Sequence, residues 1–286
     1  MSSWAPVFRL WLFRSVFICV HRWFRSYSSL RLWGAAIRQM LAAVSFLTRV
    51  PVTSGLSVSA KDIGQSARWF PLVGALIGCV YVIVLRVFSP VFPALVVAVL
   101  VLVAEALLTG ALHLDGLADM ADGFGGGRNR EDVLRIMRDH AIGAYGAMSL
   151  ILLGVLKIAS IAALIDRHRA DPYLVVAPVL GRWSGVFLSN LLPYARRSEQ
   201  EGMPSGGAVC DFVGRTELFV ATVTALPLTI ILAGWPSLAS WVVSVSVSLL
   251  MARLCRSTIG GVTGDALGAG TELSEVGVLL VALAAN

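Results

Sequence analysis

The sequence predicts an all-α protein, a polytopic integral membrane bundle of about six or seven transmembrane helices with acidic loops on the cytoplasmic side. Of its 286 residues, 57% are apolar and only 14% are charged, and the mean hydropathy is +0.80. Soluble domains are about 45–50% apolar and about 25% charged. Apolar segments recur through most of the chain, which favours a single membrane domain.

The expected helices follow eight apolar segments, at residues 34–50, 71–88, 91–112, 143–165, 173–192, 218–233, 238–254 and 276–285. A helix needs about 20 residues to cross the hydrocarbon core of a bilayer. The first and last segments are short, so we expect them to be tilted, partial or interfacial. We therefore expect six or seven of these segments to cross the membrane.

The polar connections between these segments indicate the orientation. The connections at 51–70, 113–142, 194–217 and 253–275 hold 11 Lys and Arg residues, whereas those on the opposite side hold three. Because Lys and Arg accumulate in cytoplasmic loops, we expect all four long connections in the cytoplasm. The basic residues form no run or motif of a nucleic-acid-binding module, so no nucleic-acid partner is expected.

Residues 1–39 differ from the rest of the chain. Five arginines alternate with aromatic and apolar residues over residues 4–33, and acids are absent. The arginines interrupt any signal-peptide core. An amphipathic segment on an anionic membrane surface and a non-essential extension both fit this composition. The chain is therefore divided into a basic, aromatic extension at 1–39 and a membrane-embedded domain at 40–286.

Three aspartates crowd the stretch HLDGLADMADGFGGG at 113–127. On a helix, Asp115, Asp119 and Asp122 fall within an arc of about 60°. Like charges at this spacing repel, and ionised acids near a bilayer are costly unless neutralised. A divalent cation would answer both problems, and oxygen ligands favour Mg²⁺ or Mn²⁺ over Zn²⁺. The alternative is a solvated helix end.

Glycines and arginines follow the aspartates. The glycines at 123 and 125–127 leave bare amides to which an anionic group could approach. Arginine suits phosphate oxygens, and the candidates are Arg128, Arg130 and Arg138. The order of acids, glycines and arginines indicates a metal and a phosphate.

A second acidic stretch, GGVTGDALGAGTELSE, occupies residues 260–275. It contains Thr263, Asp265, Glu272 and Glu275 and lies on the same predicted side as the aspartates. The alternative is a flexible link between two spans. We expect the two acidic stretches to form one site, because both lie on the same predicted side and an even number of crossings separates them.

Other polar residues lie within or beside apolar segments. Lys157 and Arg182 are candidate anion contacts, with pairing between helices as the alternative. His113 points away from the Asp115 side of the helix, and it could bind substrate or a neighbouring loop.

Several motifs carry a resemblance to a known family. The aspartates do not match the signature of the CDP-alcohol phosphotransferases. FLTRVPV at 46–52, ARWFPLVGALIG at 67–78, TGALHLDGLADMADGFGGG at 109–127, IMRDHAIGAYG at 136–146, APVLGRW at 177–183 and GGVTGDALGAGTELSE at 260–275 resemble the cobalamin synthase family, adenosylcobinamide-GDP ribazoletransferase. The blocks stand in family order over residues 40–286, and only 198–216 departs from the expected pattern.

The resemblance implies a multi-pass enzyme of the bacterial cell inner membrane, whose active site faces the cytoplasm. Its partners would be membrane lipid, adenosylcobinamide-GDP and α-ribazole or α-ribazole 5′-phosphate, and a homo-oligomer is possible. A ribose hydroxyl attacks the cobinamide-side phosphorus, and GMP leaves. Two rival functions are a lipid-synthesis phosphotransferase with a CDP-alcohol substrate and a transporter of corrinoids or ions.

Roles follow for the candidate residues under this resemblance. Mg²⁺ would be held by Asp115, Asp119, Asp122 and Asp265. Catalysis would involve Asp122 or Asp139 as general base for the ribose hydroxyl, together with His113. Substrate contacts are assigned to Arg128, Arg130, Arg138, Lys157, Arg182 and Thr263.

Overall fold

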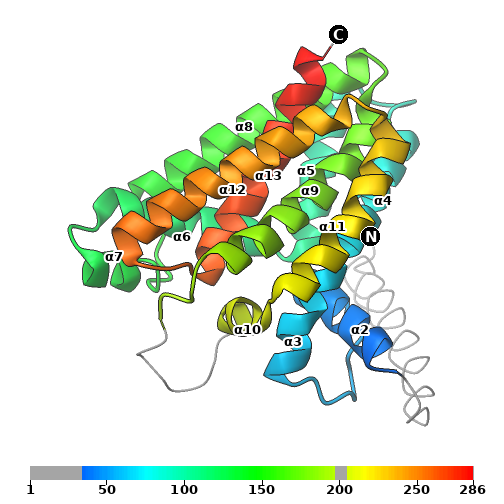
Figure 1. The fold of residues 1–286 in the computed structure, drawn as a ribbon. Coiled ribbons are helices and arrows are strands. Elements are labelled where there is room, and N and C mark those ends of the chain that lie inside the picture. Colours follow the sequence, from blue (N-terminus) through cyan, green and yellow to red (C-terminus); the bar gives the residue numbers. More distant parts are fainter. Residues whose placement is uncertain (1–33, 197–204, 286) are drawn as a thin grey trace, which may run out of the picture.

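The computed structural model describes residues 34–196 and 205–285, which form a bundle of α-helices (Figure 1). The helices are α2 (Ala35–Leu47), α3 (Ala60–Ser66), α4 (Phe70–Phe88), α5 (Ala94–Thr109), α6 (Leu112–Gly126), α7 (Arg130–Ile136), α8 (Ala144–Asp166), α9 (Ala170–Leu191), α10 (Ser205–Phe212), α11 (Arg215–Ala233), α12 (Ser237–Ile259) and α13 (Gly264–Ala284), and the 3-10 helix η1 (Ala67–Trp69) joins α3 to α4. Within the described ranges, β-pairing is limited to a parallel bridge between Tyr194 and Val262. The all-α prediction is confirmed.

The number of crossings agrees with the prediction. Six of the described helices are long and apolar enough to cross a membrane, and the bent pair of α5 and α6 gives a seventh. α2 has 13 residues and is too short to cross a bilayer, as expected for the first apolar segment.

The C-terminal region corrects the sequence-based description. The sequence predicts a polar loop at 260–275 and a short apolar segment at 276–285, whereas α13 is continuous from Gly264 to Ala284. The Thr263 side chain caps the start of this helix by accepting a hydrogen bond from Ala266 N at 3.2 Å. The acids Glu272 and Glu275 are buried inside the bundle with cationic partners, so the helix can carry them through an apolar environment.

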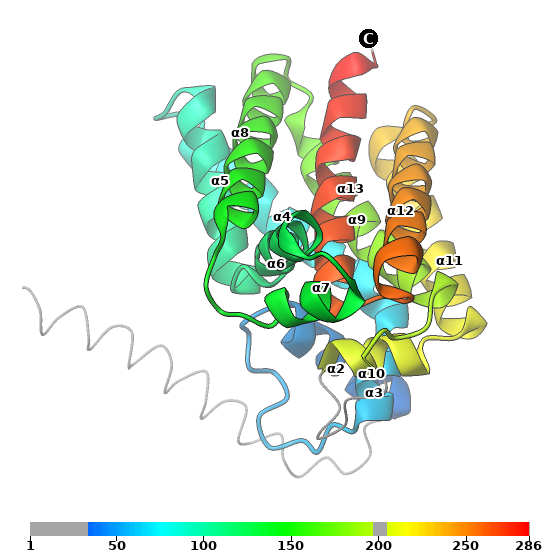
Figure 2. The same ribbon diagram turned by 90° about the vertical axis from the view of Figure 1, so that its left-hand side faces the viewer.

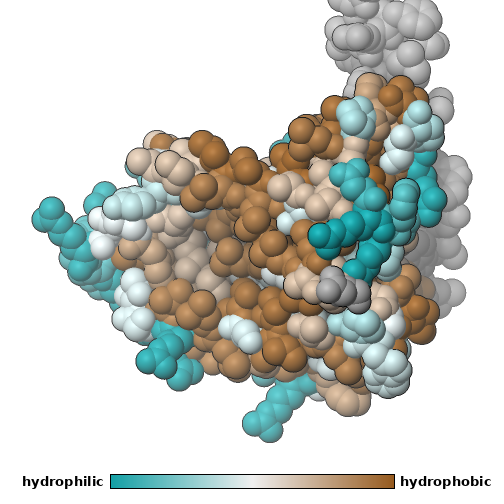
Figure 3. Space-filling view, turned by 90° about the horizontal axis from the view of Figure 1, so that it is seen from above, coloured by the Kyte–Doolittle hydropathy of each residue, from teal (hydrophilic) through white to brown (hydrophobic). Residues whose placement is uncertain are grey.

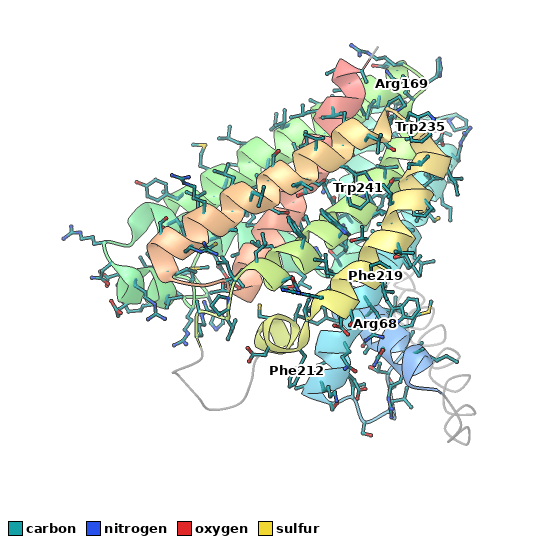
Figure 4. The ribbon with its side chains drawn as sticks, in the orientation of Figure 1. Arg68, Arg169, Phe212, Phe219, Trp235 and Trp241 are labelled. Carbon is teal, nitrogen blue, oxygen red and sulfur yellow. The ribbon has the colours of Figure 1, made fainter. Side chains whose placement is uncertain are left out.

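The long polar connections lie together. The end of the bundle that carries α3, α7 and α10, which we call the polar end, is opposite the end that carries the C-terminus (Figures 1 and 2). Figure 4 places Arg68 and Phe212 at the polar end and Arg169 and Trp235 at the other end. The described parts of these connections therefore lie at one end of the bundle, except residues 264–275, which run into it as the first half of α13.

α9 is the central helix. About 83% of its most apolar stretch is buried, compared with 28% for α8 and α12. α4 packs closely on it, because a Cβ atom at Gly74 would lie 2.3 Å from Pro178 O and one at Gly78 would lie 2.5 Å from Val175 Cα. Seen from above the orientation of Figure 1, apolar residues cover most of the visible surface (Figure 3).

The proposed N-terminal extension falls mostly outside the described residues, which begin at residue 34. α2 begins at Ala35, five residues before the expected boundary at residue 40. Its Gln39 is buried and donates a hydrogen bond to Gln65 Oε1 at 2.9 Å. Of the residues just before Met40, Gln39 is therefore packed on the bundle, whereas Ile37 is exposed.

Candidate active site

A sharp turn places the aspartate helix at the polar end. α5 and α6 meet at an angle of 92°, and the residues between them, Gly110 and Ala111, have φ values of 68° and 59°. Such values suit glycine and are uncommon for alanine. The helix that follows carries all three aspartates, so their predicted helical spacing is confirmed. Asp115 is exposed, and Asp119 and Asp122 are half-buried.

The two acidic stretches meet where α6 crosses α13 (Figure 2). A Cβ atom at Gly116 would lie 2.8 Å from Asp265 O and 2.9 Å from Asp265 Cα. A Cβ atom at Gly268 would lie 3.2 Å from His113 O. Glycine at these two positions lets the helix backbones approach each other. The tertiary structure thus brings Asp265 beside the residue that follows Asp115.

The carboxylates at this crossing interact electrostatically. The charges of Asp115, Asp265 and Asp122 all act on Asp119, and Arg196 acts on it with the opposite sign. Arg196 also donates a hydrogen bond to Asp265 Oδ2 at 3.1 Å. Acids therefore outnumber bases in the cluster. This excess of negative charge suits a hard divalent cation such as Mg²⁺. Among the described residues, however, the three acids whose oxygens converge within 4.8 Å of one another are Glu105, Glu272 and Glu275, not these aspartates.

Asp122 is held differently from the other aspartates. Its Oδ2 atom accepts a hydrogen bond from Gly143 N at 2.7 Å, and its Oδ1 atom accepts one from Gly146 N at 2.8 Å. These amides lie at the start of α8, where a carboxylate is stabilised by the unsatisfied N–H groups of the helix. Asp139 is exposed, and its Oδ1 atom accepts a hydrogen bond from Ala141 N at 3.1 Å.

A buried ion cluster lies deeper in the bundle. Lys157 Nζ donates to Glu105 Oε1 at 2.7 Å, to Glu272 Oε2 at 2.9 Å and to Glu275 Oε2 at 2.7 Å. All four side chains are at most 2% exposed. Lys157 therefore joins α5, α8 and α13. This arrangement matches the pairing alternative for Lys157, and Lys157 does not contact the cavity described next.

A cavity of about 210 Å³ opens beside the helix crossing. Four of the predicted site residues line it, namely His113, Asp115, Arg182 and Asp265. Arg182 forms a buried ion pair with Glu275, and its Nη2 atom lies 3.5 Å from His113 Nδ1. The ion pair links the cavity to the Lys157 cluster through one shared carboxylate.

The remaining predicted substrate contacts lie outside the cavity lining. Arg130 donates to Ile259 O at 3.0 Å and to Ala195 O at 2.6 Å, so it fixes the start of α7 against the end of α12. Arg128 and Arg138 are exposed at the polar end, and Thr263 is buried as the cap of α13.

Comparison with known proteins identifies the family. A family model described as cobalamin-5-phosphate synthase matches residues 39–283. The chain belongs to the cobalamin-5-phosphate synthase family. Similar relatives named adenosylcobinamide-GDP ribazoletransferase come from Syntrophobacter fumaroxidans (40% identical, over 84% of this chain and 96% of the relative), Desulfitobacterium hafniense (35%, 86% and 96%) and Shewanella frigidimarina (35%, 88% and 96%). No solved structure matches the chain.

The match to the cobalamin-5-phosphate synthase family includes the whole candidate site. Residues 39–283 contain α6, nearly all of α13 and every residue that lines the cavity. They also contain the Lys157 cluster, which lies between helices of the same region.

Three residues of this site were not found from the sequence. Glu105 is the single acid of the apolar segment 91–112, and a lone acid in such a segment is itself a signal of a buried partner. Tyr194 and Arg196 line the cavity, but nothing in their local sequence indicates that the chain after α9 returns to α13. The backbone pairing of Tyr194 with Val262 brings them there.

Proposed function

We propose that the protein transfers the adenosylcobinamide phosphate group from adenosylcobinamide-GDP to α-ribazole or α-ribazole 5′-phosphate, a late step of cobalamin biosynthesis. The relatives named above carry the name of this activity. The observation that carries the proposal is the crossing of α6 and α13, where Asp115, Asp119 and Asp265 gather beside a cavity.

We assign Mg²⁺ to this crossing, with Asp115, Asp119 and Asp265 as the residues that would hold it. Asp122 was included in the predicted ligand set, but both of its oxygens already accept amide hydrogen bonds. We therefore give Asp122 a lesser part in metal binding. When bound, Mg²⁺ supplies neutralisation of phosphate charge and stabilises the leaving group.

The reaction forms a bond between the ribose oxygen and the cobinamide-side phosphorus and breaks the bond from that phosphorus to GMP. The ribose hydroxyl must lose its proton, and Asp122 or Asp139 is the proposed acceptor. Phosphoryl transfer depends chiefly on positioning and charge stabilisation. Arg128 and Arg138 are exposed at the polar end and are proposed to meet phosphate oxygens, whereas Arg130 is committed to backbone carbonyls.

We further propose that the polar end faces the cytoplasm across a bacterial inner membrane. The support is the distribution of Lys and Arg, 11 against three, which favours the cytoplasm for the polar end. Lipid would contact the apolar outer surface of the bundle.

The proposal is tested by release of GMP. Purified protein in lipid is supplied with adenosylcobinamide-GDP and α-ribazole, with Mg²⁺ or with a chelator. We expect GMP only when both substrates and Mg²⁺ are present. Release of CMP from a CDP-alcohol, or corrinoid uptake into vesicles without GMP release, would refute the proposal in favour of one of the rival functions.

A further inference from the structure

The cavity beside the helix crossing has two kinds of lining. Apolar side chains come mainly from α2, α4 and α10 and from the first residue of α6, with one from α13, and they are Phe46, Leu47, Phe70, Val209, Leu112 and Leu267. Charged and polar side chains come from α6, α9, α13 and the segment after α9, and they include His113, Asp115, Arg182, Arg196 and Asp265. A ligand that fills the cavity must therefore be apolar in one part and polar in another.

The size of the cavity limits what can enter it. Pockets for drug-sized ligands commonly measure about 300–1,000 Å³, and this one measures about 210 Å³. A corrinoid macrocycle with its side chains is far too large for this space. A ligand about the size of a single nucleoside is the largest that this cavity is expected to bind.

The apolar wall suits a flat ring. Phe46 and Phe70 are stacked, with ring centroids 5.6 Å apart and planes inclined by 13°. Leu112 is 40% exposed at the cavity, so part of this wall is free to touch a ligand. Aromatic side chains contact flat rings favourably through offset or edge-on packing.

The polar wall retains unused hydrogen-bonding capacity. Arg182 is 1% exposed, and among the described residues its Nε atom has no hydrogen-bond partner. The same holds for Arg196 Nε. Both Nε atoms are themselves shielded from solvent, so the groups of this wall that face a ligand are the carboxylates of Asp115 and Asp265.

We infer that the cavity is the acceptor subsite, in which the flat bicyclic base of α-ribazole packs against Phe46, Phe70 and Leu112 while its ribose meets the polar wall. This assignment rests on the proposed function. The ribose hydroxyls then lie next to Asp115 and Asp265, which line the cavity, whereas Asp122 and Asp139 do not line it. In this arrangement Asp115 or Asp265, rather than Asp122 or Asp139, accepts the proton of the attacking hydroxyl. The corrinoid of the donor stays outside the cavity at the polar end.

The subsite predicts that the two substrates respond differently to substitution. In Phe46→Ala, we expect KM for α-ribazole to rise at least about tenfold, the factor that corresponds to about 1.4 kcal/mol of lost contact energy. KM for adenosylcobinamide-GDP should change by less than about twofold on the same scale. Leu112→Ala should act in the same direction, and since Leu112 is partly exposed its truncation leaves the core intact. The control is Phe92→Ala, an exposed aromatic that also packs on another phenylalanine but lies outside this cavity.

Binding of α-ribazole alone gives a second readout. Calorimetry on the full chain in detergent, without the corrinoid donor, should give binding for the wild type and for Phe92→Ala, and weakened binding for Phe46→Ala and Leu112→Ala. An unchanged KM for α-ribazole in both cavity variants, an equal rise for both substrates, or a rise confined to the donor would overturn the subsite. Wild-type protein that binds α-ribazole but releases no GMP would instead refute the proposed function.

Discussion

Replacing Lys157 with methionine removes the cation at the centre of the buried cluster and keeps a side chain of similar length. The wild-type cluster holds three glutamates against Lys157 and Arg182, so carboxyl groups already exceed cations. In Lys157→Met, Glu275 keeps Arg182, whereas Glu105 and Glu272 lose the only cation that contacts them in the described structure.

The expected loss in the free energy of unfolding follows from the number of carboxyl groups left without a cation. Removing one member of a buried ion pair typically costs about 3–5 kcal/mol, because the partner charge is left uncompensated. Three contacts of 2.7–2.9 Å are lost here, and one additional carboxyl group must be neutralised by a proton. We expect a loss near 4 kcal/mol, or a fall in melting temperature of roughly 10 °C on the scale of about 2–4 °C per kcal/mol.

The assay is thermal unfolding of the purified protein in detergent, followed by the loss of helical circular dichroism. The chain's other lysine, Lys61, is exposed, so Lys61→Met is a matched control that should melt as the wild type does. Lys157→Met combined with Glu105→Gln should recover much of the loss, since it removes one unpaired carboxylate. A melting temperature of Lys157→Met within about 2 °C of the wild type would refute the reasoning.

Three further predictions concern the helix crossing and the N-terminus. Asp119→Asn should lower GMP release by about 100-fold or more through loss of metal binding without lowering the melting temperature, and the exposed Asp166→Asn should leave the rate unchanged. Gly116→Ala should reduce GMP release at least about tenfold, because its Cβ atom would lie 2.8 Å from a backbone oxygen of α13. The control is Gly154→Ala, where a Cβ atom meets nothing within 4 Å. Equal rates in the two variants would count against a role of the α6–α13 crossing in catalysis. A chain beginning at residue 34 should retain the full GMP-release rate in membranes. A chain beginning at Met40 should have a lower melting temperature, because it lacks the hydrogen bond from Gln39 to Gln65. If the chain beginning at residue 34 inserts in membranes but is inactive, residues 1–33 have a role in the reaction.

Local patterns in the sequence determined the class of the protein and much of its architecture. Runs of apolar residues long enough for a bilayer predicted the crossings, since a helix that spans lipid must be apolar over its whole length. The excess of Lys and Arg in alternate connections predicted which connections share an end. The aspartate spacing predicted a common face on α6, because residues three and four apart on a helix are neighbours.

The same local reading failed where burial depends on distant partners. Glycines and acids at 264–275 resemble a polar loop when taken alone. They form half of a buried helix because Lys157 and Arg182, from other helices, neutralise Glu272 and Glu275. No pattern within the stretch itself reveals those partners.

Only the tertiary structure decided how the site is assembled. The crossing of α6 and α13 depends on the backbone of Gly116 meeting that of Asp265, and these residues lie far apart in the chain. The arrival of Arg196 beside Asp265 depends on the pairing of Tyr194 with Val262. Sequence periodicity fixes which side of a helix a residue occupies, whereas the packing of whole helices fixes which sides meet. That packing brought Asp115 and Asp265 to one cavity and left Lys157 and Arg130 to hold the helices together.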